Sequence, residues 1–274
     1  MSRAIAVYYI FCPQRRETSG SYLQYQREIA DQALRYGFRK QFDLEFSRDK
    51  VVTGKNGKPY WNGEEDVWFS VSNTDGLVVC GITGSGKKTD SERNTSSVDS
   101  NCPALSCGSR GPEHYRYEIG VDAERPRSVR MPLLLRCCSQ EEIQYILGKE
   151  NDCGSREERY CEENRTESSE QGCFVSEKKT DRPQFKFQVQ DRFSQIWTLK
   201  ESYIKMTGEG MSFPLKEAAF SVQKKVNGEL DISCKQPGSF AQRKIDDYWI
   251  AVCSDFGEKA RIVWQELKFP IQSV

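Results

Sequence analysis

The sequence has one histidine, His114, no long apolar run and no excess of either charge. Its longest apolar stretch, residues 4–12, is about half of the roughly 20 residues that a membrane-spanning helix needs, so no such helix is predicted. The 40 lysines and arginines balance 40 aspartates and glutamates. No overall positive field therefore attracts nucleic acid or an anionic membrane. The sequence predicts a soluble protein that binds neither.

Eleven cysteines are an odd number, and the N-terminus has no small-residue cleavage site after its short apolar stretch. We therefore expect reduced thiols and a cytoplasmic protein. The spacing of Cys102, Cys107, Cys153, Cys161 and Cys173 is poor for zinc, which favours close cysteine pairs at both ends of a site. The single histidine excludes a histidine-rich zinc site and leaves one candidate base for a Ser-His-Asp or Cys-His arrangement.

Two segments are too polar to contribute to a core. Residues 84–112 hold only Val98 and Leu105 as large aliphatic side chains, and 17 of the 35 residues in 148–182 are charged. Segments of this composition bury too little apolar surface to offset the entropy of folding. We predict two flexible insertions. Without them 210 residues remain, about 105 for each of two small domains.

The apolar periodicity predicts mixed α and β structure. Each half reads as a strand, a helix and then a hairpin, which suggests a duplicated unit. A capping box at Ser139 and Glu142 marks the start of one helix. An Asp75-Gly76 turn marks one hairpin. The predicted strands are 3–12, 67–71, 77–82, 115–124, 217–222, 229–233, 248–254 and 260–267, and the longer predicted helices are 22–38 and 189–206.

Residues 81–88 (GITGSGKK) nearly match the phosphate-binding loop of nucleoside triphosphatases. Lys88 stands where that loop needs a hydroxyl for magnesium. The residues that follow have no apolar face from which to build the helix that would cradle the phosphates. A flexible loop is the better interpretation. A nucleotide-hydrolysing protein is the alternative and requires a helix near Lys87.

Asp122 and Glu124 lie two residues apart at the end of a predicted strand (GVDAE). Alternate strand residues share a face, so both carboxylates point the same way and are close enough to chelate one cation. The alternative is a solvated polar end of the strand.

Trp197, Glu201 and Lys205 are spaced by four, which places them along one stripe of the predicted helix, with Lys200 about 100° away. An ordinary surface ion pair between Glu201 and Lys205 is the alternative. Together with Asp122 and Glu124, this stripe could bind one magnesium ion and a pyrophosphate, because magnesium prefers carboxylate and phosphate oxygens.

Four motifs in this order resemble those of the 4′-phosphopantetheinyl transferase superfamily, in its two-half, surfactin-activator type. They are residues 57–59 (GKP), 69–74 (FSVSNT), 120–124 (GVDAE) and 197–205 (WTLKESYIK). The resemblance implies a monomer with an α+β fold, a pseudo-twofold duplication of two similar α/β-sandwich halves with the active site between them. Residues 1–116 would form the N-terminal half and 117–274 the C-terminal half.

The resemblance also implies an activity: transfer of 4′-phosphopantetheine from coenzyme A to a serine of an acyl or peptidyl carrier protein, with release of 3′,5′-ADP. Magnesium would be held by Asp122, Glu124 and Glu201. Glu201, Lys205 and Asp122 would carry the chemistry. Coenzyme A would be contacted by Lys58, Ser72, Asn73, Lys200 and Lys205, and its 3′-phosphate by Arg27 and Arg35.

The chain departs from the family pattern at Asn73, where a histidine is common. Asparagine donates a hydrogen bond but carries no positive charge. We therefore expect weaker coenzyme A binding at acidic pH than in a histidine enzyme. The alternative to an active enzyme is a homologue that binds coenzyme A or a carrier protein without turnover.

Overall fold

The computed structural model describes residues 4–15, 21–63, 65–86, 118–148, 183–256 and 260–271. The first part of the chain forms β1 (Ala4–Phe11), α1 (Tyr22–Phe42), β2 (Val51–Thr53), β3 (Pro59–Trp61), β4 (Asp66–Thr74) and β5 (Leu77–Gly86), with single 3-10 turns at η2 (Arg48–Lys50) and η3 (Lys55–Gly57). The second part forms β6 (Ile119–Glu124), α3 (Met131–Cys137), α4 (Gln140–Leu147), α7 (Pro183–Thr207), η4 (Gly210–Ser212), β7 (Phe220–Lys224), β8 (Leu230–Cys234), β9 (Ser239–Ile245), β10 (Tyr248–Ser254) and β11 (Arg261–Glu266).

Two sheets carry the fold, together with two small ribbons, β2-β3 and β7-β8. The N-terminal sheet has the strand order β11-β1-β5-β4, and the C-terminal sheet has the order β6-β10-β9. In both, the strand before the long helix pairs antiparallel with the second strand of the later hairpin. The predicted α+β class is confirmed. This shared order is what a duplication predicts, while the pseudo-twofold relation stays a prediction.

Strand β11 does not follow the predicted division of the chain at residue 117. It lies parallel to β1 as the outer strand of the N-terminal sheet, with Val263 opposite Ala6. The last strand of the chain therefore returns to the first half. The interval 117–274 is not one separate structural unit.

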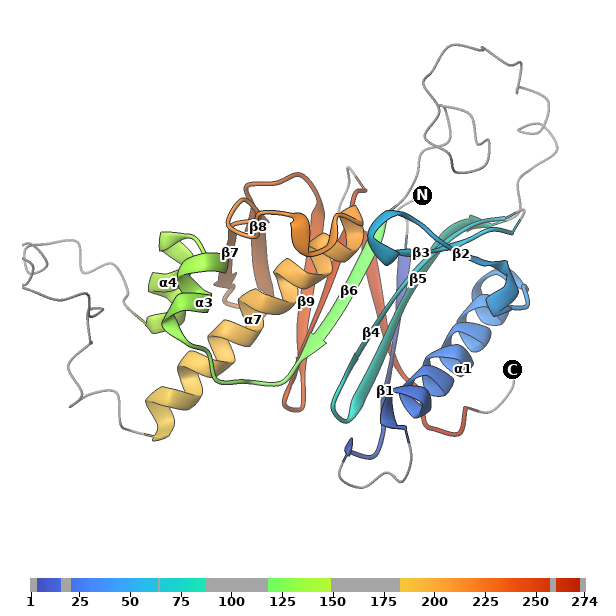
Figure 1. The fold of residues 1–274 in the computed structure, drawn as a ribbon, viewed down its shortest axis with the longest axis horizontal. Coiled ribbons are helices and arrows are strands. Elements are labelled where there is room, and N and C mark those ends of the chain that lie inside the picture. Colours follow the sequence, from blue (N-terminus) through green and yellow to red (C-terminus); the bar gives the residue numbers. More distant parts are fainter. Residues whose placement is uncertain are drawn as a thin grey trace, which may run out of the picture.

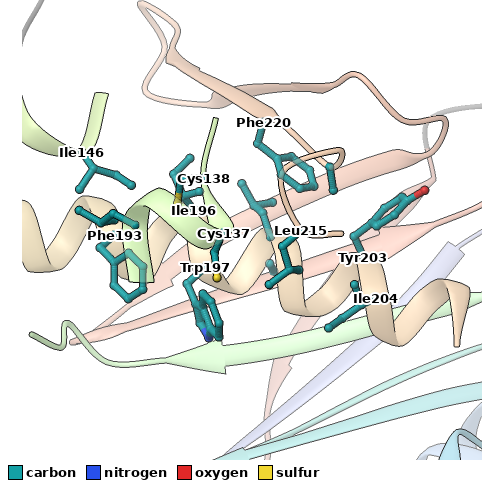
Figure 2. Packing of buried hydrophobic residues seen from close by; sticks show 14 of the residues in the cluster. Cys137, Cys138, Ile146, Phe193, Ile196, Trp197, Tyr203, Ile204, Leu215 and Phe220 are labelled. Atoms are coloured by element: carbon teal, nitrogen blue, oxygen red, sulfur yellow. The ribbon is translucent and has the colours of Figure 1, made fainter. Parts of the chain in front are cut away.

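Buried side chains lie in three layers, with α1 and α7 on opposite sides of the strands (Figure 1). Phe38 of α1 packs with Tyr8 on one face of the N-terminal sheet. Val7, on the opposite face, packs with Val121 of the C-terminal sheet. The third layer lies between α7 and the C-terminal sheet and contains the aromatic side chains seen in Figure 2, among them Phe193, Trp197, Tyr203 and Phe220. Successive residues of a strand point to opposite faces of the sheet, so only every second residue of β6 faces α7.

Helix α1 runs four residues beyond the predicted end at Phe38. Gly37 lies inside this helix and does not end it. Instead, a Cβ atom on Gly37 would lie 2.3 Å from Cδ1 of Ile82, so the glycine allows the helix to approach β5 closely. The helix ends at Asp43, which adopts a left-handed conformation and donates its backbone N–H to Arg39 and Phe38.

The first predicted insertion begins later than expected. Gly84 and Gly86 pair with Val67 and Asp66 within the β4-β5 hairpin. A strand there contradicts the phosphate-loop alternative, because the same backbone would have to curve around an anion. Residues 87–117 and 149–182 lie outside the described residues, as do His114 and the five cysteines considered for zinc.

The capping box is confirmed, with Ser139 Oγ accepting from the Glu142 backbone and the Glu142 side chain accepting from the Ser139 backbone. The Asp75-Gly76 turn and the bounds of β10 are also confirmed. Strand β9 and helix α3 were not predicted, because β9 lacks regular alternation and α3 is very short. Among the described helices, none is long and apolar enough to cross a membrane.

Candidate functional site

The site begins where α7 lies directly on β6. A Cβ atom at Gly120 would fall 1.9 Å from the carbonyl oxygen of Ser202, so only glycine permits this approach. The residues two and four positions further along β6, Asp122 and Glu124, have the same orientation as Gly120 and face the helix. The close contact between β6 and α7 therefore sets how near the two carboxylates lie to the helix.

Asp122 connects the two sheets and the helix. It is 5% exposed, and its Oδ1 accepts hydrogen bonds from Ser72 Oγ of β4 at 2.8 Å and from Lys205 Nζ of α7 at 2.6 Å. Its Oδ2 is buried and has no hydrogen-bond partner. Lys205 thus pairs with Asp122, not with Glu201 as the surface ion-pair alternative supposed.

Two further carboxylates lie in the electrostatic field of Asp122. Burial, followed by repulsion from Asp122, raises the pKa of Glu124 to about 7, against the opposing effects of Arg127 and Lys205. Burial and then repulsion from Asp122 also raise the pKa of Glu201. Asp122, Glu124 and Glu201 therefore form an acidic cluster in which ionisation of each member opposes that of its neighbours.

In the part of the chain that the structure describes, three or more His, Cys, Asp or Glu side chains do not converge as metal ligands. The chemistry of the acidic cluster nevertheless fits a hard cation. The free Oδ2 of Asp122 is a buried oxygen with an unused lone pair, and a divalent ion would relieve the repulsion that raises the pKa of Glu124.

Arg127 is a site neighbour that sequence reasoning missed. Its guanidinium lies 4.8 Å from the ring centre of Trp197 and 3.8 Å from Glu124 Oε1. Trp197 is 8% exposed, so the stripe of α7 that it shares with Glu201 and Lys205 begins at a buried side chain. The only hint in the sequence is the position of Arg127, three residues after Glu124.

The structure corrects the expected role of Lys200. This lysine was expected to contact a phosphate of coenzyme A, but its side chain is fully buried on another face of α7. Its ammonium lies 2.9 Å from Glu142 Oε1 and donates to the carbonyls of Leu215 and Ala218 at 2.8 and 2.7 Å. Because every one of these partners lies in the interior of the C-terminal half, Lys200 is a core residue.

Lys58 lies at the C-terminal end of α7, not beside Asp122. Its ammonium contacts Glu118 and the carbonyl of Met206, and burial lowers its pKa although Glu118 opposes the effect. Nearby, Asn56 Nδ2 donates to the carbonyls of Gly208 and Glu209 at 3.0 Å each. The loop that carries Lys58 therefore caps the C-terminal end of α7 from the other half of the molecule.

Asn73 neighbours Ser72 on β4 but interacts with α1. Its Nδ2 donates to Gln26 Oε1 at 3.0 Å, and Gln26 Nε2 donates to the Thr74 carbonyl at 2.6 Å. Arg27 and Arg35 are exposed on the same helix. The structure thus brings Ser72, Asp122 and Lys205 together directly, while Lys58 and Asn73 have other partners and Arg27 and Arg35 lie on the exposed side of α1.

The ACPS family model, described as the 4′-phosphopantetheinyl transferase superfamily, matches residues 118–253. The chain is 22% identical over 267 residues to the 4′-phosphopantetheinyl transferase Sfp of Bacillus subtilis, covering 93% of this chain and 88% of that protein. A second Bacillus subtilis 4′-phosphopantetheinyl transferase is 23% identical over 82% of this chain and 72% of its own length.

Among solved structures, the holo-[acyl-carrier-protein] synthase of Thermotoga maritima is 12% identical, with a TM-score of 0.29. It covers 53% of this chain and 64% of its own, a similarity too slight to carry an argument. The family match and the two relatives place the chain in the 4′-phosphopantetheinyl transferase superfamily. Within that superfamily the chain is similar to Sfp over nearly its whole length, in agreement with the order of its four motifs.

Proposed function

We propose that the protein transfers 4′-phosphopantetheine from coenzyme A to a serine of an apo acyl or peptidyl carrier protein, in a magnesium-dependent reaction that releases 3′,5′-ADP. The observation that carries the proposal is the buried Asp122, held by Ser72 and Lys205 next to Glu124 and Glu201. This arrangement gathers negative oxygens and one ammonium at the junction of the two sheets, as a pyrophosphate–metal site requires.

Asp122, Glu124 and Glu201 would hold the magnesium ion. When bound, the ion would neutralise charge on the pyrophosphate. Lys205, whose side chain is 31% exposed, reaches from Asp122 toward solvent and would stabilise the same charge as the carrier serine attacks the β-phosphorus. Its ion pair with Asp122 fixes the ammonium before substrate arrives.

Glu201 would accept the proton of the carrier serine, directly or through one water. A carboxylate with an ordinary pKa is a weak base at neutral pH. Burial and the neighbouring Asp122 raise the pKa of Glu201, which brings its basicity closer to what proton abstraction requires. The bond from serine oxygen to phosphorus forms as the bond to the 3′,5′-ADP oxygen breaks.

Coenzyme A would be held by further groups, all from the N-terminal half. Lys58 offers an ammonium at the end of α7, Asn73 an amide on β4, and Arg27 and Arg35 offer guanidinium groups on α1 for the 3′-phosphate. Lys200 is not included, because its ammonium is fully buried against Glu142.

One chain supplies both sides of this site, and the six cysteines among the described residues are free thiols. These observations support a monomer that acts in the cytoplasm, with no requirement for nucleic acid or membrane. Size-exclusion chromatography with light scattering tests the monomer. A protein that elutes as a dimer and is active only in that form would contradict it.

The decisive experiment incubates the protein with coenzyme A, magnesium and an apo carrier protein, and weighs the carrier by mass spectrometry. We expect one phosphopantetheine adduct per carrier, transfer at least about 100-fold slower with Glu201→Gln, and no adduct when EDTA replaces magnesium. If calorimetry shows coenzyme A binding but several acyl and peptidyl carriers gain no mass, the protein is a binding homologue and the proposed activity is wrong.

A further inference from the structure

Two serines of β4 lie against β6, although the two strands belong to different sheets. Ser70 Oγ accepts a hydrogen bond from the backbone N–H of Val121 at 3.0 Å, and Ser72 Oγ accepts one from Ala123 at 3.3 Å. Both serines are buried. Serine hydroxyls thus replace, at this crossing, the carbonyls of an ordinary strand partner.

Only one of the two hydroxyls reaches a carboxylate. Ser72 Oγ also donates to Asp122 Oδ1, the same oxygen that accepts from Lys205 Nζ. Two donors converging on Oδ1 fix the rotation of the carboxylate. They leave Oδ2, which is buried and has no hydrogen-bond partner, as the oxygen available to another ligand.

We propose that Ser72 is a positioning residue for Asp122, and that it turns Oδ2 toward a divalent cation. This inference rests on the proposed function, since it concerns the same magnesium site. It also replaces the direct contact with coenzyme A that the family resemblance implied. A serine has a single O–H donor, and that of Ser72 is used on Asp122, so none remains for a phosphate oxygen.

The test compares Ser72→Ala with Ser70→Ala, a control on the same strand that removes the same kind of hydrogen bond to a β6 backbone N–H. Magnesium affinity is measured by calorimetry at fixed pH without coenzyme A. We expect Ser72→Ala to bind magnesium roughly 10-fold to 100-fold more weakly than wild type, the usual effect of losing a group that orients a metal ligand. Ser70→Ala should bind it within about 3-fold of wild type, since it touches no ligand.

A second measurement separates positioning from direct contact. Coenzyme A affinity in EDTA should be the same for Ser72→Ala and Ser70→Ala if Ser72 acts only through Asp122. If Ser72→Ala alone loses affinity in EDTA, Ser72 contacts coenzyme A and the inference is overturned. Should Ser72→Ala not fold, Ser72→Cys retains the volume with a weak donor, and we expect the same loss of magnesium affinity.

The positioning role of Ser72 and the proposed function can be contradicted by different results. If wild type binds magnesium and Ser72→Ala binds it as tightly as Ser70→Ala, the positioning role is wrong while the proposed function stands. If wild type itself does not bind magnesium and transfers phosphopantetheine in EDTA, the metal site is wrong, and the positioning role falls with it.

Discussion

Lys200 and Glu142 form an ion pair at 2.9 Å in which both side chains are fully buried. Glu142 Oε1 also accepts from the backbone N–H of Phe220 at 2.8 Å, and its Oε2 accepts from the backbone N–H of Ser139 at 2.7 Å. One carboxylate therefore caps α4, holds the start of β7 and neutralises a lysine of α7. The pair fastens three elements of the C-terminal half together.

Removing one partner of this pair should destabilise the protein strongly. Lys200→Met leaves the Glu142 carboxylate buried without its cation, and we expect a loss of about 3–5 kcal/mol in the free energy of unfolding. Urea denaturation followed by circular dichroism measures it. Lys205→Met is the matched control, because Lys205 is partly exposed. A comparable loss of stability in both variants would contradict the core role of Lys200.

Lys205→Met and Glu201→Gln should keep the fold and lose transfer. Lys205 places an ammonium beside Asp122, and in the proposed mechanism Glu201 would act as the base, so each change would remove a reacting group and leave the packing of α7 intact. We expect the transfer rate to fall at least about 100-fold in Glu201→Gln, the usual scale for losing a general base. The readout is carrier mass over time, and an unchanged rate would exclude Glu201 from proton transfer.

Gly120→Ala should destabilise the protein more than the small size of the added methyl group suggests. The new methyl group would meet the backbone of Ser202, which cannot move aside without shifting α7. We expect a loss of about 1–3 kcal/mol, and lower transfer because Asp122 and Lys205 separate. Gly37→Ala is the control: its methyl group would meet the side chains of Ile82 and Tyr8, which can adjust. Equal losses of stability in the two variants would mean that the close contact between α7 and β6 does not explain the effect of Gly120→Ala.

Sequence alone located much of this site, because its central residues follow regular periods. Asp122 and Glu124 alternate along a strand, and Trp197, Glu201 and Lys205 follow one helical stripe, so their shared faces were predictable. The partners of Lys200 and Ser72 were not. These partners come from elements that only tertiary packing brings together. Glu142, the partner of Lys200, lies in the capping box of α4, and Asp122, the partner of Ser72, lies on β6 where it crosses β4. A motif lysine looks the same in sequence whether it meets a phosphate or a buried carboxylate.

Replacing Asn73 with histidine should make coenzyme A binding pH-dependent. Asn73 is neutral and is held by Gln26. A histidine there would gain a positive charge as the pH falls through about 6.5, and that charge would attract a coenzyme A phosphate. Affinity measured by calorimetry should therefore rise in Asn73→His at pH 5.5 and match wild type at pH 8. A gain of equal size at both values would show that charge is not the cause.

The acidic cluster should also make stability depend on pH when magnesium is absent. The pKa of Glu124 is about 7 in the folded protein and lower in the unfolded chain, so the folded state binds more protons between these values. Stability should therefore fall as the pH rises from about 4.5 to about 7. Urea denaturation in EDTA measures this fall, and Glu124→Gln, which has no ionisable group there, should show a smaller one. Magnesium binds the ionised carboxylates, so it should restore stability at pH 8 and have little effect at pH 5. Equal stabilisation by magnesium at both pH values would place the ion away from Glu124.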